Sequence, residues 1–315
     1  MSSDAKAAEY MAQGQKALKK TSFFSFGSGS QKFEDASDLF EKAGNQYKIS
    51  KKCAPTCDSL WIWGAMRDSV TFSIWQEAAD AYVKCADCQM KLKETSRAAQ
   101  FYQQAADALQ KVNPTDAIEY FRTAISMLCD AGRFSNAAKL QKQIAEIYES
   151  QDNKEEALES YRQASDYFSG ENQSSSANNM LLKVAQFSAQ LERYDAALEI
   201  YESIAKTSME SNLLKFNAKN HLLNAGICAL ATKDLVLVQM KMSEFQEIDY
   251  TFGDSREGKF LQEMVQAFEN FSADGFADAV YQFDTISKIE PWKISILLKV
   301  KESIMGELDA AQDLT

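Results

Sequence analysis

Few side chains in this chain of 315 residues could take part in acid–base or nucleophilic catalysis. His221 is the only histidine, so any Ser/His/Asp or Cys/His arrangement would need it. It lies in AKNHLLNA, an Ala- and Leu-rich segment typical of a helix that packs in a core. Neither GxxxxGK[ST] nor GxGxxG occurs, so no recognisable loop for a nucleotide phosphate is present. We therefore predict that the protein is not an enzyme and does not itself hydrolyse ATP.

Four cysteines have spacings that a zinc site could use. Three residues separate Cys53 from Cys57, and two separate Cys85 from Cys88. However, Cys85 occupies a small-residue position of the repeat described below, where a free cysteine acts as a small apolar side chain. The six cysteines are scattered along the chain, which fits a reducing compartment better than a disulfide framework. We expect no metal or other cofactor, and a zinc site is the alternative.

Three phenylalanines near the start of the chain form a distinct feature. Phe23, Phe24 and Phe26 lie in KKTSFFSFGSGSQKF, a Gly/Ser-rich stretch with lysines on both sides and no helical periodicity. Exposed rings bordered by cations suit a shallow contact with an anionic membrane, because rings insert at the interface while ammonium groups attract lipid headgroups. We predict a membrane-contact loop at residues 21–32. The alternative is that the rings fold back on the first helix, predicted at residues 1–20.

The overall charge and hydropathy exclude several classes of protein. The formal net charge of −11 argues against nucleic acid as a partner, because phosphate binding needs a positive contact surface. No run of 18 or more uncharged apolar residues occurs, and the first residues are polar and charged, so neither a transmembrane helix nor a signal peptide is expected. With 3 Pro and 12 Gly in a chain rich in helix formers, we expect an all-α, cytoplasmic protein.

An internal repeat indicates how these helices are arranged. Its template is Ala, then an aromatic or large apolar residue four positions later, then a small or apolar residue after three more, which places all three on one helical stripe. The copies are Ala36/Phe40/Ala43, Ala78/Tyr82/Cys85, Ala98/Tyr102/Ala105, Ala117/Phe121/Ala124, Ala157/Tyr161/Ala164, Ala177/Leu181/Val184, Ala197/Tyr201/Ile204 and Ala218/Leu222/Ala225. A weaker copy, Ala138/Lys142/Ala145, has a lysine at the central position and fills the one remaining gap.

From Ala78 onward the copies begin every 19 to 21 residues, which is enough for one helix and a short turn. Pairs of such helices form hairpins, and stacked hairpins form a solenoid. We predict a curved right-handed solenoid of TPR-like helical hairpins over residues 33–231. After it, amphipathic segments predict a C-terminal helical bundle at 232–306, with N-caps at Asp254 and Asp274 and a last helix that begins at Pro291. An unstructured acidic tail is expected at 307–315.

One segment does not fit the repeat. Between Ala36 and Ala78 the spacing is about double the usual one, and the excess has the length of Cys53–Ile74, CAPTCDSLWIWGAMRDSVTFSI. An additional packed helix would reverse the alternation of the hairpins, and CAPT, Gly64 and VTFSI are poor helix formers. We therefore predict an inserted, extruded loop at residues 53–74.

Several long segments resemble the alpha-type soluble NSF attachment proteins. They include FFSFGSGSQKFEDA, GRFSNAAKLQKQIAEIYE, SSSANNMLLKVAQFSAQLERYDAALEIYE, LLKFNAKNHLL, DSREGKFL and the ending DLT. The resemblance covers nearly the whole chain except residues 53–74. It implies a non-enzymatic adaptor for vesicle-mediated transport and membrane fusion, which binds the four-helix SNARE bundle of syntaxin-type and other SNAREs. The adaptor recruits and stimulates NSF, a hexameric AAA+ ATPase that disassembles the bundle.

The resemblance also implies roles for individual residues. Basic side chains bind the acidic SNARE surface, and here they are Lys51, Lys111, Arg133, Lys139, Lys183 and Arg256. Acidic and terminal positions bind NSF, and here they are Asp234, Glu269, Asp313 and Leu314. The membrane-contact loop at residues 21–32, called the Phe loop below, corresponds to the family's membrane-attachment loop, which implies peripheral association with the cytosolic face of vesicle, Golgi, ER or plasma membranes.

The chain departs from the family pattern at three charged positions: Asn179 replaces a lysine, and Gln266 and Asn270 replace acidic residues. A distributed electrostatic interface tolerates such single losses. Two other functions stay open. One is a generic TPR-like scaffold for other partners. The other is a metal-dependent or redox-active variant in which the inserted segment adds a site.

Overall fold

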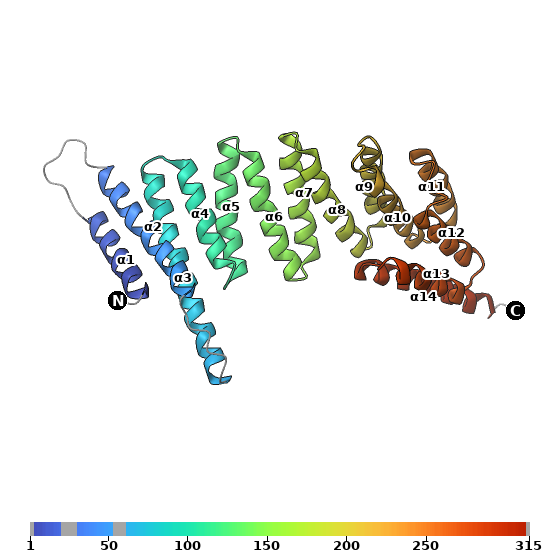
Figure 1. Ribbon diagram of the computed structural model, residues 1–315, viewed down its shortest axis with the longest axis horizontal. Coiled ribbons are helices and arrows are strands. Elements are labelled where there is room, and N and C mark those ends of the chain that lie inside the picture. The colour runs from blue at the N-terminus through green and yellow to red at the C-terminus, as the bar shows by residue number, and fades with distance from the viewer. Residues whose placement is uncertain (1–2, 20–29, 53–60, 313–315) are drawn as a thin grey trace. The chain divides into compact units, whose positions relative to one another are not determined.

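The computed structural model describes residues 3–19, 30–52 and 61–312, with the backbone alone at 51–52, 61–70 and 307–312. Within these ranges the chain forms fourteen α-helices and no strand (Figure 1). In chain order they are α1 Ser3–Lys19, α2 Gln31–Lys52, α3 Trp61–Lys91, α4 Thr95–Leu109, α5 Pro114–Asp130, α6 Phe134–Ser150, α7 Lys154–Gly170, α8 Ser174–Gln190, α9 Tyr194–Met209, α10 Lys215–Ala231, α11 Leu235–Ile248, α12 Arg256–Glu269, α13 Ala273–Ile286 and α14 Pro291–Gln312.

The chain divides into two compact units. Unit 1 contains residues 1–153 and 166–173, and unit 2 contains residues 154–165 and 174–315. In each unit, helices that follow one another in the chain pack side by side as antiparallel hairpins (Figure 1). The predicted all-α architecture of helical hairpins is therefore confirmed.

The aromatic residues of the repeat form the core. Phe40, Tyr82 and Phe121 in unit 1 and Tyr161 and Tyr201 in unit 2 are at most 2% exposed. The alanines that begin these copies are fully buried as well, so helices can approach closely and leave a space that the ring fills. The central residues of the intervening copies on α4, α6 and α8 are only partly buried. From α3 to α9 the central residue of the template is therefore fully buried on every second helix, and it is also fully buried on α2 and α10.

The hairpin turns share one backbone conformation that the sequence does not reveal. Within the described ranges, the second residue after the helix end has a left-handed φ at seven turns, and only Gly132 (φ 68°) among these residues is a glycine. The others are Lys93, Asp152, Asn172, Glu192, Lys233 and Phe271. In six of these turns the next N–H donates to a carbonyl five residues earlier, as Asn153 does to Tyr148 at 3.0 Å, which is the Schellman arrangement. The turns with this conformation join their two helices within a few residues.

The prediction of a loop over residues 53–74 is wrong for its second part. Residues 61–74 form the N-terminal part of α3, a helix of 31 residues that reaches past its neighbours (Figure 1). Adding residues to an existing helix costs far less than nucleating a new one, so Gly64 and the β-branched residues are tolerated. The alternation of hairpins is kept, because the segment lengthens one helix and adds no new one. Residues 53–60 lie outside the described ranges.

The predicted ends of the C-terminal helices agree with the structure only in part. The hydroxyls of Ser255 and Ser272 cap α12 and α13, accepting from the Gly258 and Gly275 N–H groups at 3.0 and 3.1 Å, so the predicted caps at Asp254 and Asp274 are wrong. Serine and aspartate are equally good N-cap residues, so the sequence alone did not show at which of the two neighbouring positions each helix begins. The start of α14 at Pro291 is confirmed, but the helix continues to Gln312, so residues 307–312 are not an unstructured tail.

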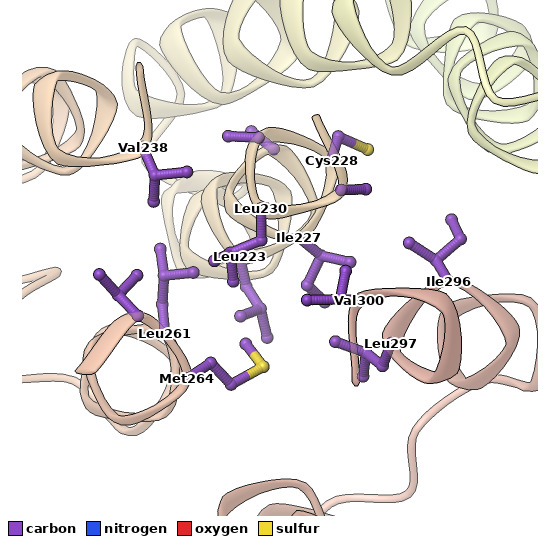
Figure 2. Packing of buried hydrophobic residues seen from close by; sticks show 14 of the residues in the cluster. Leu223, Ile227, Cys228, Leu230, Val238, Leu261, Met264, Ile296, Leu297 and Val300 are labelled. Carbon is purple, nitrogen blue, oxygen red and sulfur yellow. The ribbon is translucent and has the colours of Figure 1, made fainter. Parts of the chain in front are cut away.

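The core of unit 2 surrounds α10. Figure 2 shows Leu223, Ile227 and Leu230 of this helix between Leu261 and Met264 of α12 and the apolar side chains of α14. The buried cluster continues from α8 to α14 without a break at residue 231. The close approach of α10 and α12 needs Gly226, because a Cβ there would lie 2.4 Å from Leu261 Cδ2. The last repeat helices and the C-terminal helices therefore share one core.

Candidate protein-interaction sites

Two predicted SNARE-binding residues of unit 1 lie together. Arg133 precedes α6 and Lys139 lies one and a half turns along it, and both side chains line a groove of about 160 Å³ between α4 and α6. Both side chains are exposed, and neither forms an ion pair within the described ranges. This groove, defined by its lining residues Ala99, Gln100, Gln103, Leu128, Arg133, Asn136, Lys139 and Leu140, is called the basic groove below.

Two further lysines were predicted to bind SNAREs through unit 1. Lys111 is exposed in the turn between α4 and α5, next to Asp107. Burial raises the pKa of Asp107, and the charges of Lys48 and Lys111 oppose that rise. Lys111 therefore helps to keep a partly buried carboxylate charged, besides any contact with a partner. Lys51 belongs to the last turn of α2, but its side chain lies outside the described part.

In unit 2 the predicted basic residues lie against aromatic rings. The Lys183 Nζ on α8 is 5.9 Å from the ring centres of both Tyr161 and Phe187, which stack on each other at 5.9 Å. Arg256 begins α12, pairs with Glu257 at 3.0 Å and lies 5.7 Å from the ring centre of Phe283. Such contacts hold a long cationic side chain in place without neutralising its charge. The two cations lie on different helices and do not share one aromatic support.

The acidic pair predicted to bind NSF is also placed in unit 2. Asp234 caps α11, and its Oδ1 accepts from the Leu237 N–H at 3.0 Å. Glu269 ends α12 and accepts from Gln239 Nε2 of α11 at 2.6 Å. Because α11 and α12 are consecutive helices, the start of one and the end of the other lie on the same side of the pair. Both carboxylates are exposed there.

Five predicted site residues cannot be placed. Phe23, Phe24 and Phe26, between α1 and α2, lie outside the described ranges. Asp313 and Leu314 directly follow α14 and are also outside them.

An exposed apolar patch in unit 2 was missed by the sequence analysis. Leu213 and Phe216, where α10 begins, are 88% and 76% exposed, and the Nζ of Lys215 lies 5.6 Å from the ring centre of Phe216. The signal was in the sequence: both residues are out of phase with Ala218 and Leu222, which define the buried stripe of this helix. Apolar side chains beside a lysine can contact a partner surface with both apolar and acidic groups.

The histidine and cysteines considered for catalysis or metal binding include residues that are buried or partly buried on helices. His221 is partly buried, and burial together with the charge of Lys293 lowers its pKa. Cys85 and Cys88 are buried on α3, and the Cys85 thiol donates to the Ser37 carbonyl at 3.3 Å. Burial raises the pKa of Cys88 to about 11, so this thiol is not nucleophilic at neutral pH. Cys53 and Cys57 lie outside the described ranges. Among the described helices, none has both the length and the apolar composition needed to cross a bilayer.

Comparison with known proteins gives matches over nearly the whole chain. A family model described as soluble NSF attachment protein, SNAP, matches residues 5–66 and 72–305. The alpha-soluble NSF attachment protein of Vitis vinifera is 37% identical over 301 residues, which cover 95% of this chain and 96% of that protein. That of Mus musculus is 34% identical over 307 residues, covering 96% of each chain.

A third relative, the probable vesicular-fusion protein sec17 homolog of Schizosaccharomyces pombe, is 32% identical over 306 residues, covering 96% of this chain and 97% of that protein. The unmatched residues 67–71 fall within 53–74, where the repeat spacing indicates an insertion. The matched residues include helices of both units. The chain belongs to the soluble NSF attachment protein family.

Proposed function

We propose that this protein is a non-enzymatic adaptor in vesicle fusion, which binds SNARE bundles and attaches the ATPase NSF to them. The observation that carries the proposal is the similarity to NSF attachment proteins along almost the whole chain. A relative named as a vesicular-fusion protein supports the same process. The absence of a nucleotide-binding motif in the sequence fits an adaptor that leaves ATP hydrolysis to its partner.

The SNARE bundle is proposed to bind through basic side chains of both units, namely Lys51, Lys111, Arg133, Lys139, Lys183 and Arg256. The strongest support comes from Arg133 and Lys139, which share one groove and have no ion pair of their own within the described ranges. Charges that are not already neutralised within the protein can steer and bind an acidic surface. The exposed Leu213 and Phe216 would add an apolar contact to such an interface.

NSF is proposed to bind unit 2 through Asp234, Glu269, Asp313 and Leu314. Asp234 and Glu269 are exposed on the same side of the α11–α12 pair, and α14 leads directly to the last residues of the chain. The Phe loop is proposed to hold the adaptor at the cytosolic face of a membrane while it works on syntaxin-type and other SNAREs. The rings flanked by lysines support this role, because insertion of the rings and attraction of the lysines to anionic lipid both strengthen membrane binding.

Two lysines on α6 allow a matched test of the SNARE contact. Lys139 lines the basic groove, whereas Lys142 forms an ion pair with Glu146 at 3.3 Å and does not line it. Lys139→Glu removes one attraction and adds one repulsion, each worth about 0.2–1 kcal/mol for an exposed pair. The dissociation constant for a purified SNARE bundle should therefore rise about 2- to 30-fold.

Lys142→Glu changes the net charge by the same amount and serves as the control, with an expected change below about twofold. Equal effects of the two substitutions would mean that only the overall charge of the protein matters. If neither weakens binding, the basic groove is not part of the SNARE site. A chain that fails to retain NSF on immobilised SNAREs would favour a generic scaffold instead.

A further inference from the structure

The basic groove has an apolar floor and a polar rim. Its floor is formed by Ala99, Leu128 and Leu140, which are at most 5% exposed. Its volume of about 160 Å³ is well above the roughly 30 Å³ that a water molecule occupies in the liquid, so a whole side chain can enter it. A ligand for this groove should therefore have both methylene groups and a polar end.

The rim contains only cations and amides. Arg133 and Lys139 contribute positive charge, and Gln100, Gln103 and Asn136 contribute side-chain amides. None of the residues that line the groove is acidic, although the whole chain contains 45 Asp and Glu against 34 Lys and Arg. All five rim side chains can donate hydrogen bonds, and a carboxylate is the side chain that accepts from cations and amides together. The rim thus selects a negatively charged end group.

We propose that the basic groove holds a single glutamate side chain of the SNARE bundle. This rests on the proposed function and adds Gln100, Gln103 and Asn136 as residues that position the glutamate. The two methylene groups of glutamate lie against the apolar floor, and its carboxylate accepts from Arg133 and Lys139 at the rim. Aspartate, which is one methylene shorter, covers less of the floor. The groove thereby fixes where along its length a SNARE helix meets unit 1.

Two neighbouring glutamines on α4 provide the test. Gln103 lines the groove, whereas Gln104 points elsewhere on the helix and does not. Gln103→Glu and Gln104→Glu keep the side-chain shape and add the same charge. We expect Gln103→Glu to weaken binding of a purified SNARE bundle at least tenfold, because the new carboxylate takes the place of the ligand's beside Arg133 and Lys139. Gln104→Glu should change it less than twofold.

A second variant guards against misfolding. Asn136→Asp adds a carboxylate to the same rim within the first turn of α6, where negative charge stabilises a helix. It should weaken SNARE binding to a similar extent as Gln103→Glu while the thermal unfolding transition is kept. Single Glu→Gln substitutions along the SNARE bundle then identify the ligand. One of them should weaken binding to the parent chain, and the same substitution should cause no further loss of binding to the Gln103→Glu variant.

Equal weakening by Gln103→Glu and Gln104→Glu would overturn the inference, since only the general field would then act. So would the lack of any SNARE glutamate that couples to Gln103. The proposed function fails separately, by a different result: the parent chain would not bind the SNARE bundle at all.

Discussion

Replacing Lys241 by Met should strongly destabilise unit 2. The Lys241 Nζ of α11 lies 3.0 Å from Oε1 of Glu202 on α9 and 2.8 Å from Oε2 of Glu244 on its own helix. The Lys241 and Glu202 side chains are 16% and 10% exposed, so this pair is largely removed from water. It connects α11, the helix that Asp234 caps, to α9 of the last repeat hairpin.

The expected cost follows from the charge that the substitution leaves behind. Methionine keeps most of the apolar stem of lysine but leaves the Glu202 carboxylate without a cation from α11. Breaking a buried ion pair in this way costs about 3–5 kcal/mol, and the residual exposure places the cost of Lys241→Met at about 3 kcal/mol. Adding Glu202→Gln removes the unpaired charge and should recover about half of this loss. The free energy of unfolding from urea titration, with an unchanged m value, measures both.

Lys142→Met is the matched control, since Lys142 and Glu146 are 44% and 47% exposed and an exposed pair contributes at most about 0.5 kcal/mol. A loss below about 1 kcal/mol for Lys241→Met would refute the reasoning, because the Glu202 carboxylate would then be well solvated. The absence of recovery in the double variant would refute it as well, since the loss would not come from the unpaired charge.

The same group sets a dependence on pH. Burial lowers the pKa of Lys241, but hydrogen bonds to Glu244 and Glu202 outweigh burial and raise the pKa above its usual 10.5. The folded state therefore binds this proton more tightly than the unfolded state. Its contribution to stability is fully present below pH 10.5 and is lost as the pH rises through the folded pKa. The difference in stability between the parent and Lys241→Met should shrink across that alkaline range.

Three other predictions concern the two ends of the chain and the hairpin turns. Replacing Phe23, Phe24 and Phe26 by Ser should reduce SNARE disassembly on liposomes more than in solution, since only the membrane contact is lost; equal loss in both assays would indicate a role in folding. Leu314→Ala should leave SNARE binding intact and abolish stimulation of NSF, and normal stimulation of ATP hydrolysis would disprove the role of the tail. Lys93→Gly should raise the free energy of unfolding by about 0.5–1 kcal/mol, because it relieves a left-handed φ of 63°, and urea titration checks this.

The helices and their buried faces could be predicted because they depend on local periodicity. Ala117, Phe121 and Ala124, for example, are all fully buried, as their spacing required. The turns could not be predicted in the same way. Glycine usually marks a left-handed residue, but Asp152 and Glu192 occupy that conformation here because the packed helices on both sides dictate it.

The error over residues 61–74 has a related cause. Helix propensities describe that segment as an isolated peptide. In the structure it extends a helix whose remaining part is already packed in the core, so no new helix has to be nucleated.

The candidate sites were predictable as residue types but not as surfaces. The family resemblance selected Arg133 and Lys139, yet nothing in the sequence places them in one groove with Gln103, which comes from another hairpin helix. Leu213 and Phe216 could have been found from the sequence, because both are out of phase with the buried stripe of Ala218 and Leu222. Which side chains share a surface depends on the packing of helices, and sequence spacing within one helix does not specify it.

The most direct test of the adaptor role is reconstituted disassembly of a fluorescently labelled SNARE bundle by NSF and ATP. With the full chain present, we predict that NSF binds the bundle and that the labels separate as ATP is hydrolysed. Without the chain, or with Lys139→Glu at limiting concentration, separation should be slow. An NSF that neither binds the bundle nor separates the labels when the chain is present at saturation would contradict the central claim.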